Sequence, residues 1–287
     1  MIPLSLEAPA KLNLSLHVVG RRQDGYHLLE SEMVLLELAD RLLLLPGATG
    51  LRVEQISGDE IPVDQHNLAW RGLLAGLGAE PELACLALEK RIPAASGLGG
   101  GSSDAAAAWR LGRVAAGAGE SATPDDLSSL ARLGADVPFF AARCAAAHVT
   151  GIGEAIAPAP VPSAAWVVLV HPDFGLSTAD VFGALRPDDH ADRPDGNDLL
   201  GPALRLRPEL GEIMGRMTAA GGEPRMTGAG STIFTLTDDR QRAASIAARL
   251  RSSGMRVTET RLRSEAAAII ELGDASNDAG ASPQGMG

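Results

Sequence analysis

A glycine-rich stretch in the first half of the chain constrains its fold most. Residues 91–112 read RIPAASGLGGGSSDAAAAWRLG, and positions 96–103 hold four glycines and three serines between a strand-like run and a helix-like run. Glycine adopts backbone conformations that other residues avoid, and it lets a ligand approach the main chain closely. The first N–H groups of a helix lack internal partners, and the helix dipole is positive at that end. The stretch is therefore a candidate phosphate site.

The spacing of these glycines matches neither of two common nucleotide loops. A Walker A loop needs a lysine after its last glycine, where this chain has Ser102. A G-x-G-x-x-G motif that begins at Gly97 needs a glycine at the same place, position 102. Ser102 and Ser103 can cap the helix, bond a phosphate oxygen or hold a metal ion. Taken alone, the stretch fits a flexible turn with a serine cap as well as it fits a phosphate site.

Length and charge narrow the class of protein. The 287 residues suffice for one large or two modest domains. The net charge of −11 argues against nucleic acid and against a membrane surface as partners, because both need a basic face. A small phosphorylated ligand is still compatible with this charge, since a few N–H donors and one lysine can bind it in an acidic protein.

The sequence also predicts a cytoplasmic protein without a structural metal. No apolar run approaches the roughly 20 residues of a membrane span, and the N-terminus lacks the basic region and apolar core of a signal peptide. Cys85 and Cys144 lie in apolar runs, which indicates buried thiols in a reducing compartment. The six histidines are scattered without the spacing of metal ligands.

Hydrophobic periodicity predicts strands that alternate with helices along the whole chain. Apolar and polar residues alternate over 11–18, as in a half-buried strand, and a turn at 22–27 separates it from one or two strands over 33–45. Thr123, followed by Pro124, marks the start of a helix with Gly134 at its exit. The other predicted strands are 82–90, a hairpin at 145–156, 166–170, 231–237 and 255–262, and the other predicted helices are 66–78, 102–116, 178–185, 208–220 and 239–252. Such alternation favours an α+β fold.

A proline-rich segment divides the chain. PAPVPS, at 158–163, is typical of a linker or a domain boundary. We therefore predict a first domain over 1–157 and a second domain over 158–272. Small and polar residues fill 273–287, so we expect a disordered tail there.

Several polar and aromatic side chains outside the glycine stretch could have either a catalytic or binding role or a purely structural one. Lys11 and Asn13 share one face of the predicted strand, and Lys11 is one of only two lysines. Alone, Lys11 is more typical of a solvated surface cation. Asp136 follows a helix exit, where an aspartate often caps a turn. Tyr26, the only tyrosine, suits an aromatic lid over the core, and Asn67 suits a helix N-cap.

Five segments in order resemble one superfamily of small-molecule kinases. PAASGLGGGSSDAAA, at 93–107, resembles the phosphate loop of the galactokinase, homoserine kinase, mevalonate kinase and phosphomevalonate kinase superfamily. The other segments are APAKLNLSLHVVGRRQDGYH at 8–27, LGADVPFF at 133–140, STADVF at 177–182 and TGAGST at 227–232. Together with EKRIP before the loop, they resemble most closely the branch that acts in non-mevalonate isoprenoid biosynthesis.

The resemblance implies a fold and an activity. It implies an α+β fold of two domains, a ribosomal-S5-type N-terminal domain that binds ATP and a ferredoxin-like C-terminal domain, with the site between them. It implies that ATP, with Mg²⁺, phosphorylates the 2-hydroxyl of 4-diphosphocytidyl-2-C-methyl-D-erythritol, a cytidine diphosphate-linked methylerythritol. Ser103 is the one candidate ligand named for the metal ion, and the chain is expected to be a monomer or a homodimer.

The resemblance also implies roles for particular residues. The expected phosphate cradle comprises Pro93, Ala94, Ala95, Ser96, Gly97, Leu98, Gly99, Gly100, Gly101, Ser102 and Ser103, and Asn67 is expected near the ATP base. Lys11 is expected beside the acceptor hydroxyl, and Asp136 as the group that orients or deprotonates it. The expected substrate contacts are Asn13, Tyr26, His27, Thr178, Phe182, Gly228 and Gly230. One departure stands beside Asn67, where His66 replaces an expected aspartate.

Three other functions remain as alternatives. A sibling kinase for homoserine or a mevalonate derivative would keep the loop, but it should lack the DGYH and GADVPFF segments. A non-catalytic nucleotide-binding module would keep the loop without needing Lys11 and Asp136. A purely structural protein would need none of these motifs.

Overall fold

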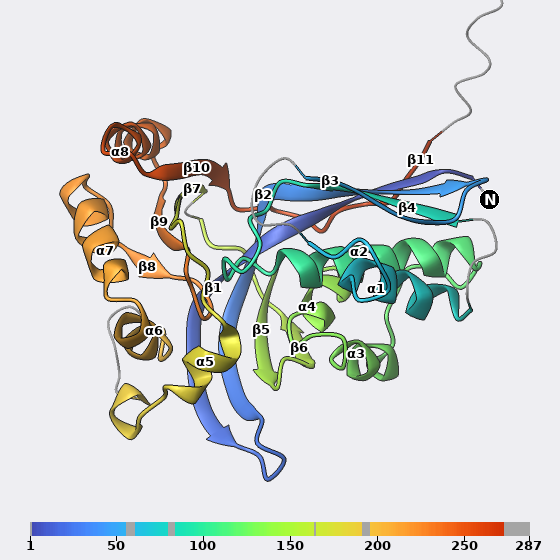
Figure 1. The fold of residues 1–287 in the computed structure, drawn as a ribbon, viewed down its shortest axis with the longest axis horizontal. Coiled ribbons are helices and arrows are strands. Elements are labelled where there is room, and N and C mark those ends of the chain that lie inside the picture. The colour runs from blue at the N-terminus through green and yellow to red at the C-terminus, as the bar shows by residue number, and fades with distance from the viewer. Residues whose placement is uncertain (1, 56–60, 80–83, 164, 191–195, 273–287) are drawn as a thin grey trace, which may run out of the picture.

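The computed structural model describes residues 2–55, 61–79, 84–163, 165–190 and 196–272, which form two β-sheets with helices packed against them (Figure 1). The strands are β1 (Leu4–Arg21), β2 (His27–Pro46), β3 (Gly50–Gln55), β4 (Ala84–Lys90), β5 (Ala146–Gly151), β6 (Ala155–Pro158), β7 (Trp166–His171), β8 (Arg225–Met226), β9 (Ile233–Thr237), β10 (Arg256–Arg261) and β11 (Ile270–Glu271). The helices are α1 (Leu68–Leu77), α2 (Gly100–Ala115), α3 (Pro124–Leu130), α4 (Val137–Ala141), α5 (Thr178–Gly183), α6 (Leu200–Leu206), α7 (Glu209–Ala219) and α8 (Arg240–Ser252), with a 3-10 helix at Pro187–His190.

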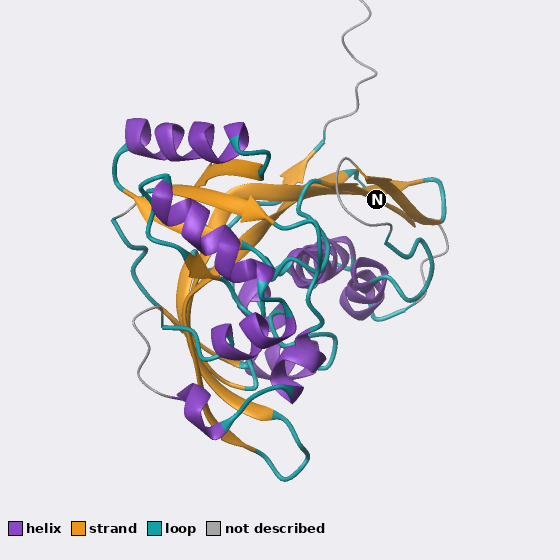
Figure 2. Ribbon diagram, turned by 60° about the vertical axis from the view of Figure 1, so that its left-hand side comes forward, coloured by secondary structure: helices purple, strands orange, loops and turns teal. Residues whose placement is uncertain are grey.

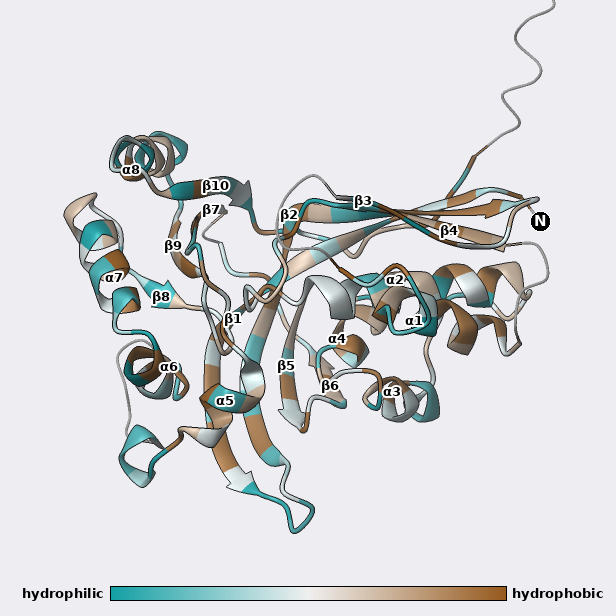
Figure 3. Cartoon of the chain, viewed as in Figure 1, coloured by the Kyte–Doolittle hydropathy of each residue, from teal (hydrophilic) through white to brown (hydrophobic). Residues whose placement is uncertain are grey.

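The first sheet is built on the long antiparallel hairpin of β1 and β2. Its strand order is β11-β1-β2-β4-β3, and β5 and β6 branch from β2. Polar and apolar residues alternate along the far end of this hairpin, as the colours of Figure 3 show. Leucines at alternate positions of both strands, such as Leu4, Leu6, Leu42 and Leu44, share one buried cluster with residues of α1 and α2. The sheet curves, and most of the helices lie on one side of it (Figure 2).

α1 and α2 approach each other closely because α1 presents glycines to its neighbour. A Cβ added at Gly72 would lie 2.1 Å from the carbonyl oxygen of Ala105, and one at Gly76 would lie 2.2 Å from that of Trp109. Backbone that close leaves no space for a side chain. This packing fixes the axis of α2, whose N-terminus begins at the end of the glycine stretch.

The second sheet is smaller and fully antiparallel, in the order β10-β7-β9-β8. Its core also includes Leu16 and Val18, which come from β1 of the first sheet. β1 therefore contributes side chains to the cores of both halves of the molecule, and its long ribbon can be followed in Figure 1.

Most predicted elements are confirmed, and most boundaries shift by three residues or fewer, but β1 begins seven residues and β2 six residues before the predicted start. The helix begun by Thr123 has the full capping box, because Thr123 and Asp126 each accept a hydrogen bond from the other's backbone N–H. The predicted strands over 33–45 are part of one strand, β2. The unpredicted elements are β3, α4, the 3-10 helix at Pro187–His190, α6, β8 and β11, which are all seven residues or shorter. Tertiary pairing, which no local pattern records, decides such short segments.

The predicted domain limits, 1–157 and 158–272, stay a prediction. β11 pairs with β1, so the chain returns to the first sheet after β10. The predicted tail at 273–287 lies outside the described residues. Within the described ranges no helix is long and apolar enough to cross a membrane. Cys85 is buried, and burial raises the pKa of the partly buried Cys144 thiol.

Candidate active site

A cavity of about 570 Å³ lies where β1, the glycine loop, α5 and the segment around Gly228 meet. Most of the predicted site residues line it: Lys11, Asn13, Asn67, Pro93, Ala94, Ala95, Ser96, Gly97, Gly99, Gly100, Gly101, Ser102, Asp136, Thr178, Phe182 and Gly228. The others, Tyr26, His27, Leu98, Ser103 and Gly230, lie off its wall. Six segments that are distant in the sequence therefore converge on one space.

The glycine loop is pressed against the second glycine-rich segment, 227–232. Gly97 has φ of 77°, and a Cβ there would lie 2.5 Å from the carbonyl oxygen of Thr227. The backbone N–H of Thr232 donates to the carbonyl oxygen of Ser96 at 3.1 Å. Only glycine satisfies both the positive φ and the close approach at position 97.

The loop ends in a bare helix N-terminus. α2 has Gly99 as its N-cap, with φ of 71°, and no side chain caps the first turn. Of the three roles that the sequence left open for Ser102 and Ser103, capping this helix does not occur, because both residues lie inside it. The N–H groups of the first turn have no side-chain partner, so they are available to an anion in the cavity.

Lys11 lies on the cavity wall. Its Nζ donates to Oδ1 of Asn13 at 2.5 Å and lies 3.5 Å from Oδ2 of Asp136. Its backbone N–H donates to the carbonyl oxygen of Leu98 at 3.0 Å. Lys11 is only 3% exposed, so the interpretation as a solvated surface cation is wrong. Asp136 is the N-cap residue of α4, and its side chain keeps 29% exposure toward solvent.

Asn13 joins the strand to the segment at 227–232. Its backbone N–H donates to Oγ1 of Thr227 at 3.0 Å, and its Nδ2 donates to Oγ of Ser31 at 2.8 Å. A Cβ at Gly228 would lie 3.2 Å from Oδ1 of Asn13 and 3.3 Å from Nζ of Lys11. The backbone at 228 therefore approaches the lysine as closely as a glycine permits.

The ring of Phe182, which lines the cavity, stacks on the ring of His27, which lies off the cavity wall. The rings of His27 and Phe182 lie 4.9 Å apart between centroids, with an interplanar angle of 21°. Phe182 and Thr178 line the cavity, whereas Tyr26 is 62% exposed. The interpretation of Tyr26 as a lid over the core is therefore wrong.

Asn67 has both a structural position and a place on the cavity wall. It caps α1, because its Oδ1 accepts from the N–H of Ala69 at 2.9 Å. Its Nδ2 donates to the carbonyl oxygen of Pro62 at 2.6 Å. His66, the departure from the family pattern, pairs with Asp64 at 3.0 Å.

Comparison with known proteins identifies the family. The model of the GHMP kinase N-terminal domain matches residues 67–143, and that of the GHMP kinase C-terminal domain matches 182–255. The 4-diphosphocytidyl-2-C-methyl-D-erythritol kinase of Paramagnetospirillum magneticum is 38% identical over 277 residues, which cover 87% of this chain and 94% of that protein. This chain belongs to the 4-diphosphocytidyl-2-C-methyl-D-erythritol kinases of the GHMP kinase family.

Further relatives and solved structures agree with this placement. The kinase of the same name from Thermus thermophilus is 40% identical over 267 residues, covering 86% of this chain and 92% of that protein. A crystal structure of 4-(cytidine 5'-diphospho)-2C-methyl-D-erythritol kinase, 36% identical, superposes with a TM-score of 0.74 over 90% of this chain and 98% of its own. Homoserine kinase from Cytophaga hutchinsonii, 17% identical, shares the fold with a TM-score of 0.65 over 94% and 97% of the two chains.

A buried charged cluster behind the glycine loop was not predicted. Asp40, Lys90 and Asp104 are each at most 4% exposed, and Lys90 and Asp104 also line the cavity of this kinase. Burial raises the pKa of Asp104 to about 8, although the charge of Lys90 acts the other way. Burial lowers the pKa of Lys90, but the two carboxylates outweigh it and raise that pKa overall. The one available signal was that Lys90 is the only lysine besides Lys11.

Proposed function

We propose that this chain transfers the γ-phosphoryl group of ATP to the 2-hydroxyl of 4-diphosphocytidyl-2-C-methyl-D-erythritol, giving ADP and the 2-phosphate. The observation that carries the proposal is the position of Lys11, whose Nζ lies 3.5 Å from the Asp136 carboxylate on the wall that the glycine loop also lines. Relatives with this activity in their names match over most of the chain.

The glycine loop is proposed to hold the phosphates of ATP. Its backbone runs along the cavity from Pro93 to Gly101 and leads into the uncapped N-terminus of α2. Fixed N–H donors and a helix dipole stabilise the negative charge that spreads over the transferred phosphoryl group. Lys11, buried and aimed at the same space, adds a full positive charge next to them.

Asp136 is proposed to orient the acceptor hydroxyl and to take its proton. The transition state of phosphoryl transfer is loose in most analyses, so the hydroxyl needs positioning more than early deprotonation. A carboxylate held 3.5 Å from the Lys11 ammonium is fixed in place. A fixed position suits a group that orients the hydroxyl and accepts its proton late in the reaction.

The stacked pair His27 and Phe182, with Thr178, is proposed to select the cytosine ring. A flat, neutral pyrimidine binds well against an aromatic face. Phe182 offers its ring to the cavity, and His27 supports it from behind, at 4.9 Å. Tyr26 would approach the substrate from the exposed hairpin end, and Gly228 and Gly230 would carry the backbone beside the substrate phosphates.

Magnesium is proposed to arrive with ATP. Among the described residues, no three His, Cys, Asp or Glu side chains converge on one point. Mg²⁺ in kinases keeps several waters and takes its other ligands from phosphates and one or two protein oxygens. The Ser102 side chain at the start of α2 suits that limited role, because Ser102 lines the cavity. We also propose a cytoplasmic location and a monomer or homodimer.

ADP release with a panel of acceptors tests the function. Each reaction contains ATP, Mg²⁺ and one acceptor. The four acceptors are 4-diphosphocytidyl-2-C-methyl-D-erythritol, homoserine, mevalonate and phosphomevalonate. We expect turnover with the cytidylyl compound alone, and a loss of about 10²-fold or more in Asp136→Asn, as for a lost catalytic acid–base group. Asp125→Asn, at an exposed carboxylate in the first turn of α3, is the matched control and should keep full activity.

The other outcomes favour the alternatives. Turnover with another acceptor alone would mean a sibling kinase and would remove the proposed substrate. ATP binding without turnover on any acceptor would mean a nucleotide-binding module.

A further inference from the structure

One buried cluster holds both ends of the glycine loop. The loop, residues 91–99, joins β4 to α2, and the cluster takes one residue from each side and one from β2. Lys90 is the last residue of β4, Asp104 lies in the second turn of α2, and Asp40 lies in β2. Their exposures are 4%, 3% and 0%.

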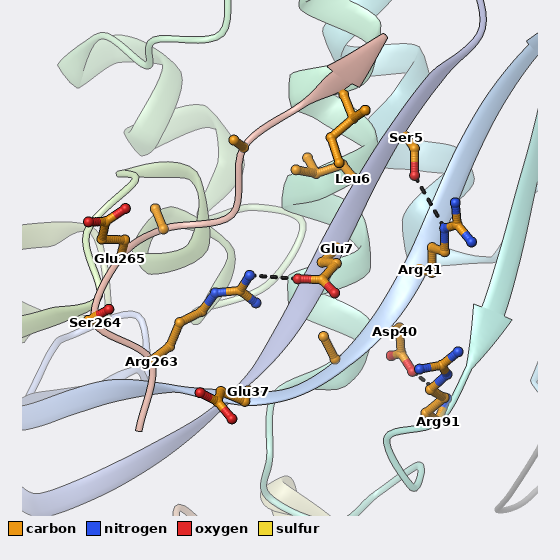
Figure 4. A pocket seen from close by; sticks show the side chains of 14 residues that line it. Ser5, Leu6, Glu7, Glu37, Asp40, Arg41, Arg91, Arg263, Ser264 and Glu265 are labelled. Carbon is orange, nitrogen blue, oxygen red and sulfur yellow. Dashed lines mark hydrogen bonds and ion pairs between the residues drawn. The ribbon is translucent and has the colours of Figure 1, made fainter. Parts of the chain in front are cut away.

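Asp40 fixes the start of the loop. Its Oδ1 accepts from the backbone N–H of Arg91 at 2.5 Å and from that of Ile92 at 2.9 Å. Figure 4 shows Asp40 beside Arg91 on the wall of a groove between β1, β2 and the segment 263–270. The loop therefore leaves the sheet with its first two peptide groups bound to a carboxylate.

Lys90 connects that start to the end of the loop. Its Nζ forms a short hydrogen bond to Oδ2 of Asp40 and another, of 2.7 Å, to Oδ2 of Asp104. A Cβ at Gly100 would lie 3.3 Å from this Nζ, so the ammonium group lies directly under the first residue of α2. One side chain therefore ties β2, β4 and α2 together.

Stability is a poor explanation for this arrangement. One buried cation between two buried carboxylates has a large desolvation cost, and well-packed apolar residues often serve as well. Oδ1 of Asp104 is buried and has no hydrogen-bond partner among the described residues, which adds to the cost. Such a cluster is better explained by the geometry that it fixes.

We propose that Asp40, Lys90 and Asp104 are positioning residues for phosphoryl transfer. They hold the two ends of the glycine loop at a fixed separation, so that its N–H groups converge on the phosphates before ATP binds. Preorganised donors lower the barrier because they need no rearrangement during the reaction. The inference rests on the proposed function for the identity of the nucleotide.

Lys90→Met, compared with Arg110→Met, provides the test. Arg110 also lies in α2 and is also a buried cation, which donates to Glu120 at 2.6 Å and to the carbonyl oxygen of Ala267 at 2.8 Å, but it is remote from the loop. Each variant is measured by thermal unfolding, by calorimetric titration with a non-hydrolysable ATP analogue, and by kinetics in which ATP and acceptor are varied separately.

We expect both variants to unfold at lower temperature and only Lys90→Met to lose nucleotide function. Its KM for ATP and its Kd for the analogue should rise about tenfold or more, as expected for misplaced donors, while its KM for the acceptor changes less than twofold. If Lys90→Met and Arg110→Met behave alike toward ATP, the cluster is only structural and the proposal is wrong.

Asp104 supplies a second pair of variants in case Lys90→Met does not fold. Asp104→Ala removes the tie to α2, whereas the amide oxygen of Asp104→Asn can still accept from Lys90. We expect weaker binding of the analogue in the first variant and near-normal binding in the second. Equal binding in both would overturn the proposal. Because analogue binding needs no acceptor, this test is independent of whether the proposed acceptor is correct.

Discussion

At the scale of single residues, the site depends on the surroundings of Lys11. The strand gives this lysine a polar face, yet its side chain is buried by the glycine loop and by the segment at Gly228. Asp136 and Asn13 are its polar neighbours, at 3.5 Å and 2.5 Å. The charge is therefore held in the cavity at a fixed place, where it counts for more than in water.

Phe182→Ala should weaken the binding of the cytidylyl acceptor. The variant loses the ring that stacks on His27 and lines the cavity. We expect KM for the acceptor to rise about tenfold, since an aromatic contact contributes about 0.5–1.5 kcal/mol beyond its buried area. KM for ATP should stay the same. Phe174→Ala, at a partly buried ring that packs on the same core but lies off this cavity, is the control. An unchanged acceptor KM in Phe182→Ala would remove this ring from the base site.

The position of a site residue could be predicted from the sequence where a local pattern determines it, but not where the tertiary fold determines it. The alternation at 11–18 correctly indicated that Lys11 and Asn13 share a face. Nothing in the spacing indicated that Asp136 would reach Lys11, because α4 and the fold of the loop bring them together. The cluster of Asp40, Lys90 and Asp104 was missed for the same reason: it joins three elements that only the sheet brings together.

At the scale of elements, the glycine loop matters most, and its glycines differ in kind. Gly99 has φ of 71°, and a Cβ there would lie 3.0 Å from Cζ of Phe140 and 3.1 Å from Cε of Lys11. Gly78, the C-cap residue of α1, has φ of 73° with open space around it. The two positions impose the same backbone strain, and only one of them lies in the site.

Gly99→Ala and Gly78→Ala should therefore separate strain from function. Each substitution places a Cβ in the left-handed region, which costs about 1–2 kcal/mol, so both variants should lose similar stability to urea. Only Gly99→Ala should raise KM for ATP, by about tenfold or more, because it alone displaces the loop and Lys11. A normal KM for ATP in Gly99→Ala would argue against the loop as the phosphate cradle.

The helices and strands themselves were largely predictable, because each carries a local signal. Thr123 and Pro124 marked the start of α3, and Asn67 the start of α1. The sequence predicted that the glycine loop leads into a helix, but not which residue caps that helix. The N-cap residue is Gly99 and not a serine. A positive φ at the cap excludes most side chains, and the sequence does not show which loop residue takes it.

At the scale of the whole molecule, His171 links two strands of the second sheet to the glycine-rich segment at 227–232. It ends β7, its Nε2 lies 3.0 Å from Oγ1 of Thr258 in β10, and its Nδ1 lies 3.5 Å from Oγ1 of Thr232. Burial, and to a lesser extent the charge of Arg256, lowers the pKa of His171 to about 4. The neutral ring is therefore the form that the fold accommodates.

This histidine should make the fold less stable in acid. The folded state has the lower pKa, so between pH 6.5 and about 4 the unfolded chain binds the extra proton, and stability falls as the pH falls. From pH 7 to pH 5 the free energy of unfolding of the wild type should fall by about 2 kcal/mol more than that of His171→Gln. This value follows from about 1.36 kcal/mol per unit of pH between the two pKa values. Urea unfolding at both pH values measures this difference. Equal losses in the two proteins would show that His171 does not titrate in this window.

The central claim, transfer of phosphate to the 2-hydroxyl of the cytidylyl acceptor, is tested most directly by the structure of the product. The purified chain, ATP and Mg²⁺ are incubated with 4-diphosphocytidyl-2-C-methyl-D-erythritol, and the mixture is followed by ³¹P NMR with mass spectrometry. We expect one new phosphomonoester, coupled to the methylerythritol skeleton at carbon 2, in equal amount to ADP. Free phosphate in place of that ester, or a phosphate at another position, would contradict the account.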